Sequence, residues 1–264
     1  MNKPSKNALQ WQRFGRHASR DFLMTVPKGH SHEQLHQRPS ELQVAHLRDQ
    51  HPELLVGDAV ASKAQKRLHM VSRFAVLVLK TEGGQEIAPL RQLETAAEAV
   101  EQLAATHDGT WGLLYHNLMA LFLPDTDPEQ CRAMAFDIQT RLAAEDFGPV
   151  SGGIAQYPTD SYQRHQVLDN AIKALYHAGF CGHRAIVVFD AVSLNISGDR
   201  LYNQGDIAGA ISEFSIAARL DPANANVFNS LGVAYGVMGN YPKALEAFRI
   251  AIRLDTGEGI AYYN

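Results

Sequence analysis

The sequence lacks the features of several protein classes. It contains only two cysteines, Cys131 and Cys181. Two cysteines cannot build the disulfide framework of a small secreted protein, so we expect a reducing, cytoplasmic location. No apolar run approaches the roughly 20 residues that span a bilayer, and the basic N-terminus has no apolar signal-peptide core. We therefore expect no membrane span.

The chain also lacks an excess of basic residues. It has 24 Lys and Arg against 28 Asp and Glu, for a formal net charge of −4. Because binding to nucleic-acid phosphates needs a basic surface, we expect no nucleic-acid partner. The phosphate loop, the dinucleotide fingerprint and the Gly-x-Ser-x-Gly nucleophile elbow are all missing. We therefore assign no catalytic residue, no metal ligand and no cofactor.

Histidine is concentrated near the N-terminus, within residues 1–62, which we interpret as an extension that is partly helical or disordered. Histidine clusters can bind transition metals. However, no cysteine lies nearby and the spacing is not a zinc pattern, so a polar surface segment is the favoured interpretation and a metal-binding protein the weaker one. The cluster comprises His30, His32, His36, His46 and His51.

The C-terminal part, residues 191–264, repeats itself at an offset of 34 residues. Each unit is predicted to be two helices joined by a turn at 203–206 or 238–241. Small residues let the two helices approach closely, and we expect the repeated Phe to fill the gap between neighbouring units. One unit cannot bury its apolar face alone, so the units must stack. The matching pairs include Gly198 and Gly232, Gly205 and Gly239, Ala210 and Ala244, Phe214 and Phe248, and Ala217 and Ala251.

These positions resemble the tetratricopeptide repeat (TPR), whose 34-residue pattern uses Gly, Ala, Phe, Ala and Pro. Pro222 closes the first unit, Thr256 replaces proline in the second, and "GEGIAYYN" is similar to the start of a third. The resemblance implies an α-solenoid whose first helices line a groove for a protein or peptide partner. Asn195 and Asn229 are equivalent and either bind a peptide backbone as a ladder or are merely solvated. The candidate groove residues are Asn195, Asp199, Tyr202, Asn226, Asn229 and Val233.

The middle part, residues 63–190, has the mixed pattern of an α+β domain. The element order β-α-β-β-α-β-α-β predicts a ferredoxin-like palm with its helices on one face. Residues 109–127 hold two short apolar runs around a polar centre, which predicts a β-hairpin with a tight tip. The other expected elements are the helix "KAQKRLHMVSRF", strands at 74–80, 150–158 and 184–190, and helices at 90–107, 127–145 and 161–180.

Two segments of this palm, "SGGIAQYP" and "NAIKALYHAGFCGHRAIVVFD", resemble the closing motifs of GGDEF domains, the diguanylate cyclases of bacterial signalling. On that resemblance the signature Gly-Gly-Asp-Glu-Phe falls on the hairpin tip, and none of its five residues is kept. The resemblance implies that backbone at the two glycines approaches the nucleotide and that the acidic residues serve a divalent metal. The signature positions are Tyr115, His116, Asn117, Leu118 and Met119.

The replacements remove the chemistry that the resemblance implies. Mg²⁺ prefers hard oxygen ligands, usually carboxylates and phosphates, and Leu118 offers none. The region where the family carries a metal-binding Asp is Lys80-Thr81-Glu82, and the family's phosphate-contacting Lys is replaced at Gly179. We therefore predict a degenerate GGDEF-like domain without cyclase activity.

The sequence thus predicts a non-catalytic signalling or assembly scaffold. The repeats bind a protein partner, and the palm serves docking, homodimerisation or ligand sensing. The alternative is a divergent diguanylate cyclase, or a receptor for GTP or a cyclic nucleotide. It requires acidic residues to converge at the tip, and the candidates are Glu82, Asp108 and Asp160.

Overall fold

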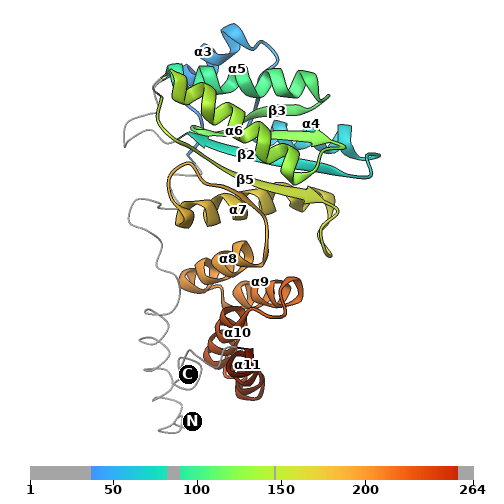
Figure 1. Cartoon of the computed structure of the whole chain (residues 1–264), viewed down its shortest axis with the longest axis vertical. Coiled ribbons are helices and arrows are strands. Elements are labelled where there is room, and N and C mark those ends of the chain that lie inside the picture. Colours follow the sequence, from blue (N-terminus) through green and yellow to red (C-terminus); the bar gives the residue numbers. More distant parts are fainter. Residues whose placement is uncertain (1–36, 82–89, 146, 255–264) are drawn as a thin grey trace, which may run out of the picture. The chain divides into compact units, whose positions relative to one another are not determined.

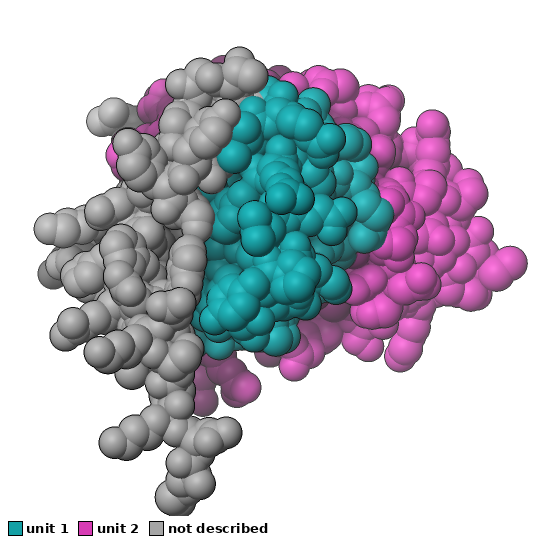
Figure 2. All heavy atoms as spheres, turned by 90° about the horizontal axis from the view of Figure 1, so that it is seen from below, with its two compact units in different colours: residues 1–26, 190–264 teal, residues 27–189 magenta. Residues whose placement is uncertain are grey.

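The computed structural model of the chain describes residues 37–81, 90–145 and 147–254. The chain divides into two compact units, residues 27–189 and residues 190–264 together with 1–26, which Figure 2 shows in different colours. We call the first the palm and the second the repeat unit. None of the described helices is long and apolar enough to cross a membrane.

The palm is built around a six-stranded mixed sheet of order β1-β3-β4-β2-β5-β6. The central pairs β3–β4, β4–β2 and β2–β5 are antiparallel, and the outer pairs β1–β3 and β5–β6 are parallel. Its elements are α3 (Glu41–Gln50), β1 (Leu55–Val56), α4 (Asp58–Leu68), β2 (Phe74–Thr81), α5 (Leu90–Thr106), β3 (Thr110–Tyr115), β4 (Leu118–Pro124), α6 (Pro128–Ala144), β5 (Val150–Tyr157), the 3-10 turn η1 (Arg164–Gln166), α7 (Val167–Cys181) and β6 (Ile186–Val188).

Helices cover both faces of this sheet. Leu77 and Leu79 of β2 share a core cluster with residues of α5 and α6. The neighbouring residue Val78 pairs with Gly153 on the opposite face, where a Cβ atom on Gly153 would lie only 2.1 Å from Ala171 O of α7. Figure 1 shows α5 and α6 on one side of the sheet and α7 on the other. The expectation that the helices lie on one face was therefore wrong, and β2 is apolar on both faces because both are covered.

The start of the palm also differs from the expectation. The helix "KAQKRLHMVSRF" is instead α4, which begins at Asp58 and ends at Leu68, so it spans the boundary that we placed between residues 62 and 63. The short strand β1 before it was not predicted, because two residues carry no readable periodicity. It pairs with β3 through Leu55 and Val56.

The helix that follows the hairpin begins as its sequence indicates. Asp127 is the N-cap of α6, and its side chain accepts a hydrogen bond from Gln130 N while Gln130 Oε1 accepts one from Asp127 N. Pro128 occupies the first turn, where its missing N–H costs nothing. This capping box fixes the point at which the chain turns from β4 into α6.

The described residues of the repeat unit form two helical hairpins, α8 (Ala191–Gln204) with α9 (Ile207–Leu220), and α10 (Ala225–Val237) with α11 (Tyr241–Leu254). Gly205 and Gly239 close the first helix of each hairpin with φ of 91° and 78°, a backbone conformation that favours glycine. A Cβ on Gly198 would lie 2.4 Å from the Phe214 ring. Phe214 therefore packs on the glycine of its own hairpin. The start of a third unit lies outside the described residues.

Candidate functional site

The candidate site is the tip of the β3–β4 hairpin. Tyr115 pairs with Leu118, so His116 and Asn117 alone form the turn. The pairing register between Leu113 and Tyr115 is shifted by an irregularity, which is typical of a bulge that redirects a side chain. The predicted hairpin with a tight polar tip is confirmed. The tip lies beside the end of β2 in the sheet, because Lys80 pairs with Leu118.

The backbone groups of this turn are bonded to other parts of the palm. His116 N donates to Gln37 O at 2.9 Å, and Gln43 Nε2 donates to His116 O at 3.3 Å. On the other side, Thr81 N donates to Asn117 O at 3.0 Å. The tip is thus hydrogen-bonded to the segment before α3, to α3 itself and to the end of β2.

The Asn117 side chain is also used inside the protein. It is buried, and its Nδ2 donates to Thr81 O at 3.1 Å. Its Oδ1 is buried without a hydrogen-bond partner in the described part of the chain. The Asn117 amide therefore links the tip to β2 by a hydrogen bond and is not exposed to solvent.

The last two signature positions are core residues. Leu118 and Met119 are 0% and 1% exposed, and Met119 belongs to the core cluster beneath α5 and α6. A thioether and a hydrocarbon chain offer no hard oxygen ligand for Mg²⁺. Replacing either with a carboxylate would bury a charge in an apolar layer, which is strongly unfavourable without a partner.

The two titratable groups of the tip are shifted toward their neutral forms. Burial lowers the pKa of His116. A hydrogen bond to the backbone of Gln37 opposes this shift, and the charge of Lys80 adds to it. Burial raises the pKa of Tyr115, and the carboxylates of Asp58 and Asp169 raise it further. Neither side chain is an anion at neutral pH, so neither supplies the negative charge that attracts a divalent cation.

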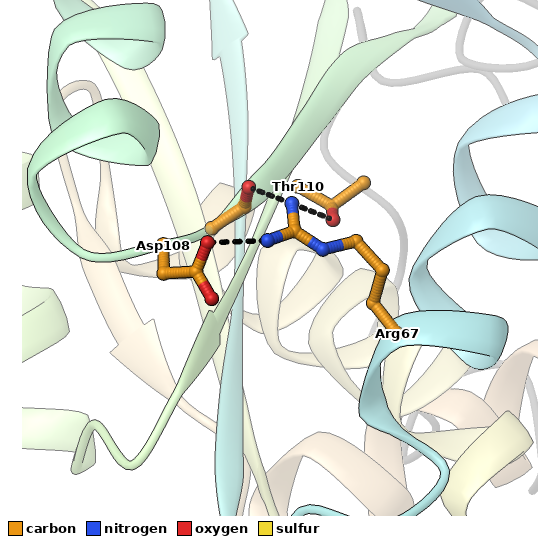
Figure 3. Close-up of polar contacts among 4 residues, drawn as sticks. Arg67, Asp108 and Thr110 are labelled. Atoms are coloured by element: carbon orange, nitrogen blue, oxygen red, sulfur yellow. Dashed lines mark hydrogen bonds and ion pairs between the residues drawn. The ribbon is translucent and has the colours of Figure 1, made fainter.

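Of the three acidic residues required by the cyclase alternative, the two that the structure describes, Asp108 and Asp160, do not lie at the tip. Asp108 pairs with Arg67, whose guanidinium also donates to Gly109 O at 3.0 Å and Thr110 Oγ1 at 3.4 Å, as Figure 3 shows. This cluster precedes β3, at the opposite end of the hairpin from its tip.

Asp160 lies at that opposite end as well, because it follows Tyr157, which pairs with Phe74 at the start of β2. Glu82 lies outside the described residues. Within the described ranges, no group of three or more His, Cys, Asp or Glu side chains could hold a metal ion.

The histidines of the N-terminal cluster are placed only in part. His30, His32 and His36 lie outside the described residues. His51 is buried, and its Nδ1 lies 2.7 Å from Glu101 Oε2, while its ring packs edge-on against Trp111 at 5.4 Å. His51 therefore belongs to the packing between α3, α5 and β3.

The six groove candidates of the repeat unit differ in exposure. Asn195 and Asp199 of α8 are buried, at 9% and 3% exposed. Tyr202, Asn229 and Val233 are half-buried, and Asn226 is exposed. The equivalent pair Asn195 and Asn229 is thus not displayed alike, and α10 offers the more accessible amides.

Sequence reasoning missed several contacts at these sites. Gln37, Gln43 and Thr81 hold the tip, yet nothing in their local pattern marks them as its partners. Lys243 lies 5.3 Å from the Tyr235 ring centroid in the repeat unit, a cation–π contact that a spacing of eight residues across a turn does not reveal.

Comparison with known proteins adds a family match for the repeat unit. A family model described as "TPR repeat" matches residues 198–239. Residues 198–239 form a tetratricopeptide repeat. A similar solved structure is the second TPR of Spaghetti (RPAP3) bound to an HSP90 peptide, with 26% identity, 28% of this chain and 68% of that chain covered, and a TM-score of 0.27. Comparison with curated protein sequences finds no match.

The palm is similar in fold to solved GGDEF domains. One is the active GGEEF domain of a diguanylate cyclase from Vibrio cholerae, with 15% identity, coverage of 58% of this chain and 97% of that chain, and a TM-score of 0.41. Another is the GGDEF domain of YfiN from Pseudomonas aeruginosa, with 17% identity, coverage of 52% and 98%, and a TM-score of 0.45. At these values the likeness is no evidence for a shared activity.

Proposed function

We propose that this protein is a non-catalytic scaffold, in which the tetratricopeptide repeats bind a protein segment and the palm docks, dimerises or senses a ligand without turning over GTP. The hairpin tip carries this proposal. Its backbone groups bond to Gln37, Gln43 and Thr81, and Leu118 and Met119 are buried core residues.

The tip therefore lacks the two things that cyclase chemistry would need from it. A nucleotide needs free backbone donors and room for close approach, and both Tyr115 and His116 carry side chains at the positions where the family has glycine. A divalent metal needs carboxylates, and the tip presents a neutral imidazole, a buried amide and a hydrocarbon chain. Lys80 at the end of β2 adds a positive charge nearby, which opposes a cation.

For the repeat unit we propose that α10 supplies the principal contacts to an extended peptide. Asn226 is exposed and Asn229 half-buried, and they lie three residues apart, on neighbouring positions of one helix face. An Asn side chain both donates and accepts hydrogen bonds, so two such amides match the N–H and C=O groups of a peptide backbone.

The palm proposal is tested by titrating GTP and cyclic di-GMP, each with Mg²⁺, into the purified full chain in a calorimeter, alongside an assay for product from GTP. An active diguanylate cyclase serves as the positive control. We expect no product at high micromolar GTP. Product formation would overturn the proposal, whereas binding without product would identify the palm as a sensor.

The repeat proposal is tested by panning a displayed library of random peptides on the full chain. Selected peptides are then titrated into the Asn226→Ala and Asn229→Ala variants. We expect each variant to weaken binding by about fivefold, since one net hydrogen bond contributes about 1 kcal/mol. The control is Asn203→Ala, an exposed amide in the last turn of α8. Equal affinity for all three variants would place the peptide elsewhere.

A further inference from the structure

A second concave site lies in the palm, at the end of the sheet opposite the tip. Its volume is about 370 Å³, which is within the range of about 300–1,000 Å³ typical of small-molecule sites. It is bounded by the end of α4, the start of β2, the end of β5 and the turn η1. Phe74 pairs with Pro124 and Tyr157 at this end, whereas the tip lies beyond Lys80.

The floor of the cavity is apolar and largely aromatic. Leu68, Phe74, Phe122 and Tyr157 line it. The rings of Phe74 and Tyr157 stack with centroids 5.4 Å apart and an interplanar angle of 17°. Phe74 and Phe122 are 2% and 6% exposed, so they support the floor from beneath. The surface that a ligand could contact comes from the half-buried Tyr157 and from the exposed lining residues Gln65, His69, Gln163 and His165. A preformed aromatic floor favours a flat apolar body over a flexible chain.

Arg164 fixes one wall of the cavity. Its guanidinium lies 4.4 Å from the Tyr157 ring centroid, and its Nη1 donates to Leu68 O at 3.0 Å and to Val71 O at 2.5 Å. The first bond satisfies the last carbonyl of α4, which would otherwise present the negative end of the helix dipole to the cavity, and the second holds the segment that follows α4.

Arg164 gives the cavity wall a positive charge. His69 and His165 also line the cavity and can donate hydrogen bonds, and no Asp or Glu is among the lining residues. Lys66 lies in the last turn of α4, whereas the charge of Arg67 is paired with Asp108. The helix α7 begins directly after Arg164–Gln166, so its positive N-terminal end is close by. An anionic group is thus favoured here and a cationic one opposed.

We propose that this cavity binds a small flat ring that carries one anionic group, either a carboxylate or a phosphate. The ring packs against the accessible part of Tyr157 and beside Gln65, above the buried Phe74 and Phe122, and the anion lies toward Arg164 and His165. The inference deepens the ligand sensing proposed for the palm, and it does not depend on the tip or the repeat unit, because none of the cavity's lining residues belongs to either.

The test measures the binding of four probes to the full chain by calorimetry and by saturation-transfer NMR. They are 1-naphthoate, its neutral isostere 1-naphthamide, 1-naphthyl phosphate and inorganic phosphate. We expect saturable binding of at least one naphthyl anion below millimolar concentration, and about tenfold weaker binding of the amide, which lacks the charge-assisted hydrogen bond. The two naphthyl anions show whether carboxylate or phosphate is preferred.

Two pairs of variants locate the binding. Gln65 lines the cavity from the exposed side of α4, so Gln65→Trp should fill the entrance and abolish binding without touching the core. Its control is Ser62→Trp, also exposed and one turn farther from His69. His165 is exposed as well, and His165→Gln should weaken the anions by about tenfold while leaving the amide unchanged.

Three results would overturn the proposal. The first is the absence of saturable binding by both naphthyl anions, provided the chain is folded by circular dichroism. The second is binding that inorganic phosphate matches, since no ring would then be required. The third is equal binding by Gln65→Trp and Ser62→Trp, which would place the ligand outside the cavity.

Discussion

The palm and the repeat unit are each stabilised by internal contacts, and these contacts differ in how far apart the partners lie in the sequence. In the palm, β2 pairs with β4 and with β5, both of which come later in the chain after intervening helices. In the repeat unit, α8 packs on α9 and α10 packs on α11, and each partner is the next element along the chain. Repeat units therefore gain stability from neighbours, whereas the palm must close long loops before its sheet exists.

Closely packed glycines in the two units show the same difference. Gly153 faces the backbone of α7, with Leu175 N at 2.4 Å from the position of an added Cβ. Gly198 and Gly232 each face a phenylalanine ring of their own hairpin. A backbone cannot move without displacing its helix, whereas a ring can rotate if there is room beside it.

The largest effect is expected from Gly153→Ala. Because the new methyl group would overlap Ala171 O and Leu175 N, α7 must leave the sheet, and we expect a loss of about 3 kcal/mol in palm stability. The measurement is urea unfolding followed by Trp111 fluorescence in a Trp11→Phe background. The control Gly236→Ala, where nothing lies within 4 Å of the new Cβ, should leave the palm transition unchanged. A loss below about 1 kcal/mol would show that α7 is free to shift.

The next effect separates the two repeats. Gly198→Ala should cost about 1–2 kcal/mol, since Phe214 is fully buried and overpacking outweighs the gain of about 1 kcal/mol in helix propensity. Gly232→Ala should stay within about 0.5 kcal/mol of the parent, because Phe248 is only half-buried and its ring can turn outward. Far-ultraviolet circular dichroism during denaturation measures both. Equal losses would contradict this difference.

A smaller effect is expected at the tip. Asn117→Ala removes the donor to Thr81 O and leaves that buried carbonyl without this partner, which costs about 1–2 kcal/mol. Part of the loss is offset, because the unpartnered Oδ1 of Asn117 disappears as well. Trp111 fluorescence during urea unfolding measures the change, with the exposed Asn203→Ala as the reference. No change would mean that Asn117 does not hold the tip to β2.

The smallest effect is a dependence of palm stability on pH. The folded pKa of His116 is lowered, so the unfolded chain binds more protons once the pH falls below about 6.5, the usual histidine value. Stability should therefore decrease as the pH falls through that value toward the folded pKa, and this contribution should then level off. Subtracting the pH profile of His116→Asn isolates the effect. A profile identical to the parent's would assign the dependence to other groups.

Local patterns in the sequence predicted much of the fold. The Gly and Phe positions of the repeats recur at a fixed interval, and the two apolar runs around Tyr115-His116-Asn117 mark the hairpin, so both follow from neighbouring residues. The helix at 127–145 is equally local, since it begins at the capping residue Asp127. Each of these features depends on residues within one or two elements, and that is the range over which periodicity and turn chemistry are informative.

The remaining features depend on distant partners. Thr81 and Gln37 meet the tip only because the sheet register brings them there, and no pattern near them signals it. The close contact between α7 and Gly153 depends on how β2 pairs with β5. The burial of Asn195 differs from that of Asn229 although the repeat makes them equivalent, since burial depends on what surrounds each helix and not on its own sequence.

The strands at the two margins of the palm sheet are very short. Within the described residues, β1 has two residues and β6 has three, and each pairs in parallel with its inner neighbour. Long open margins invite another chain to add a strand, whereas such short ones present few unpaired backbone groups. Short margins therefore favour a palm homodimer that joins through side chains on its helices, and we expect little strand-to-strand polymerisation.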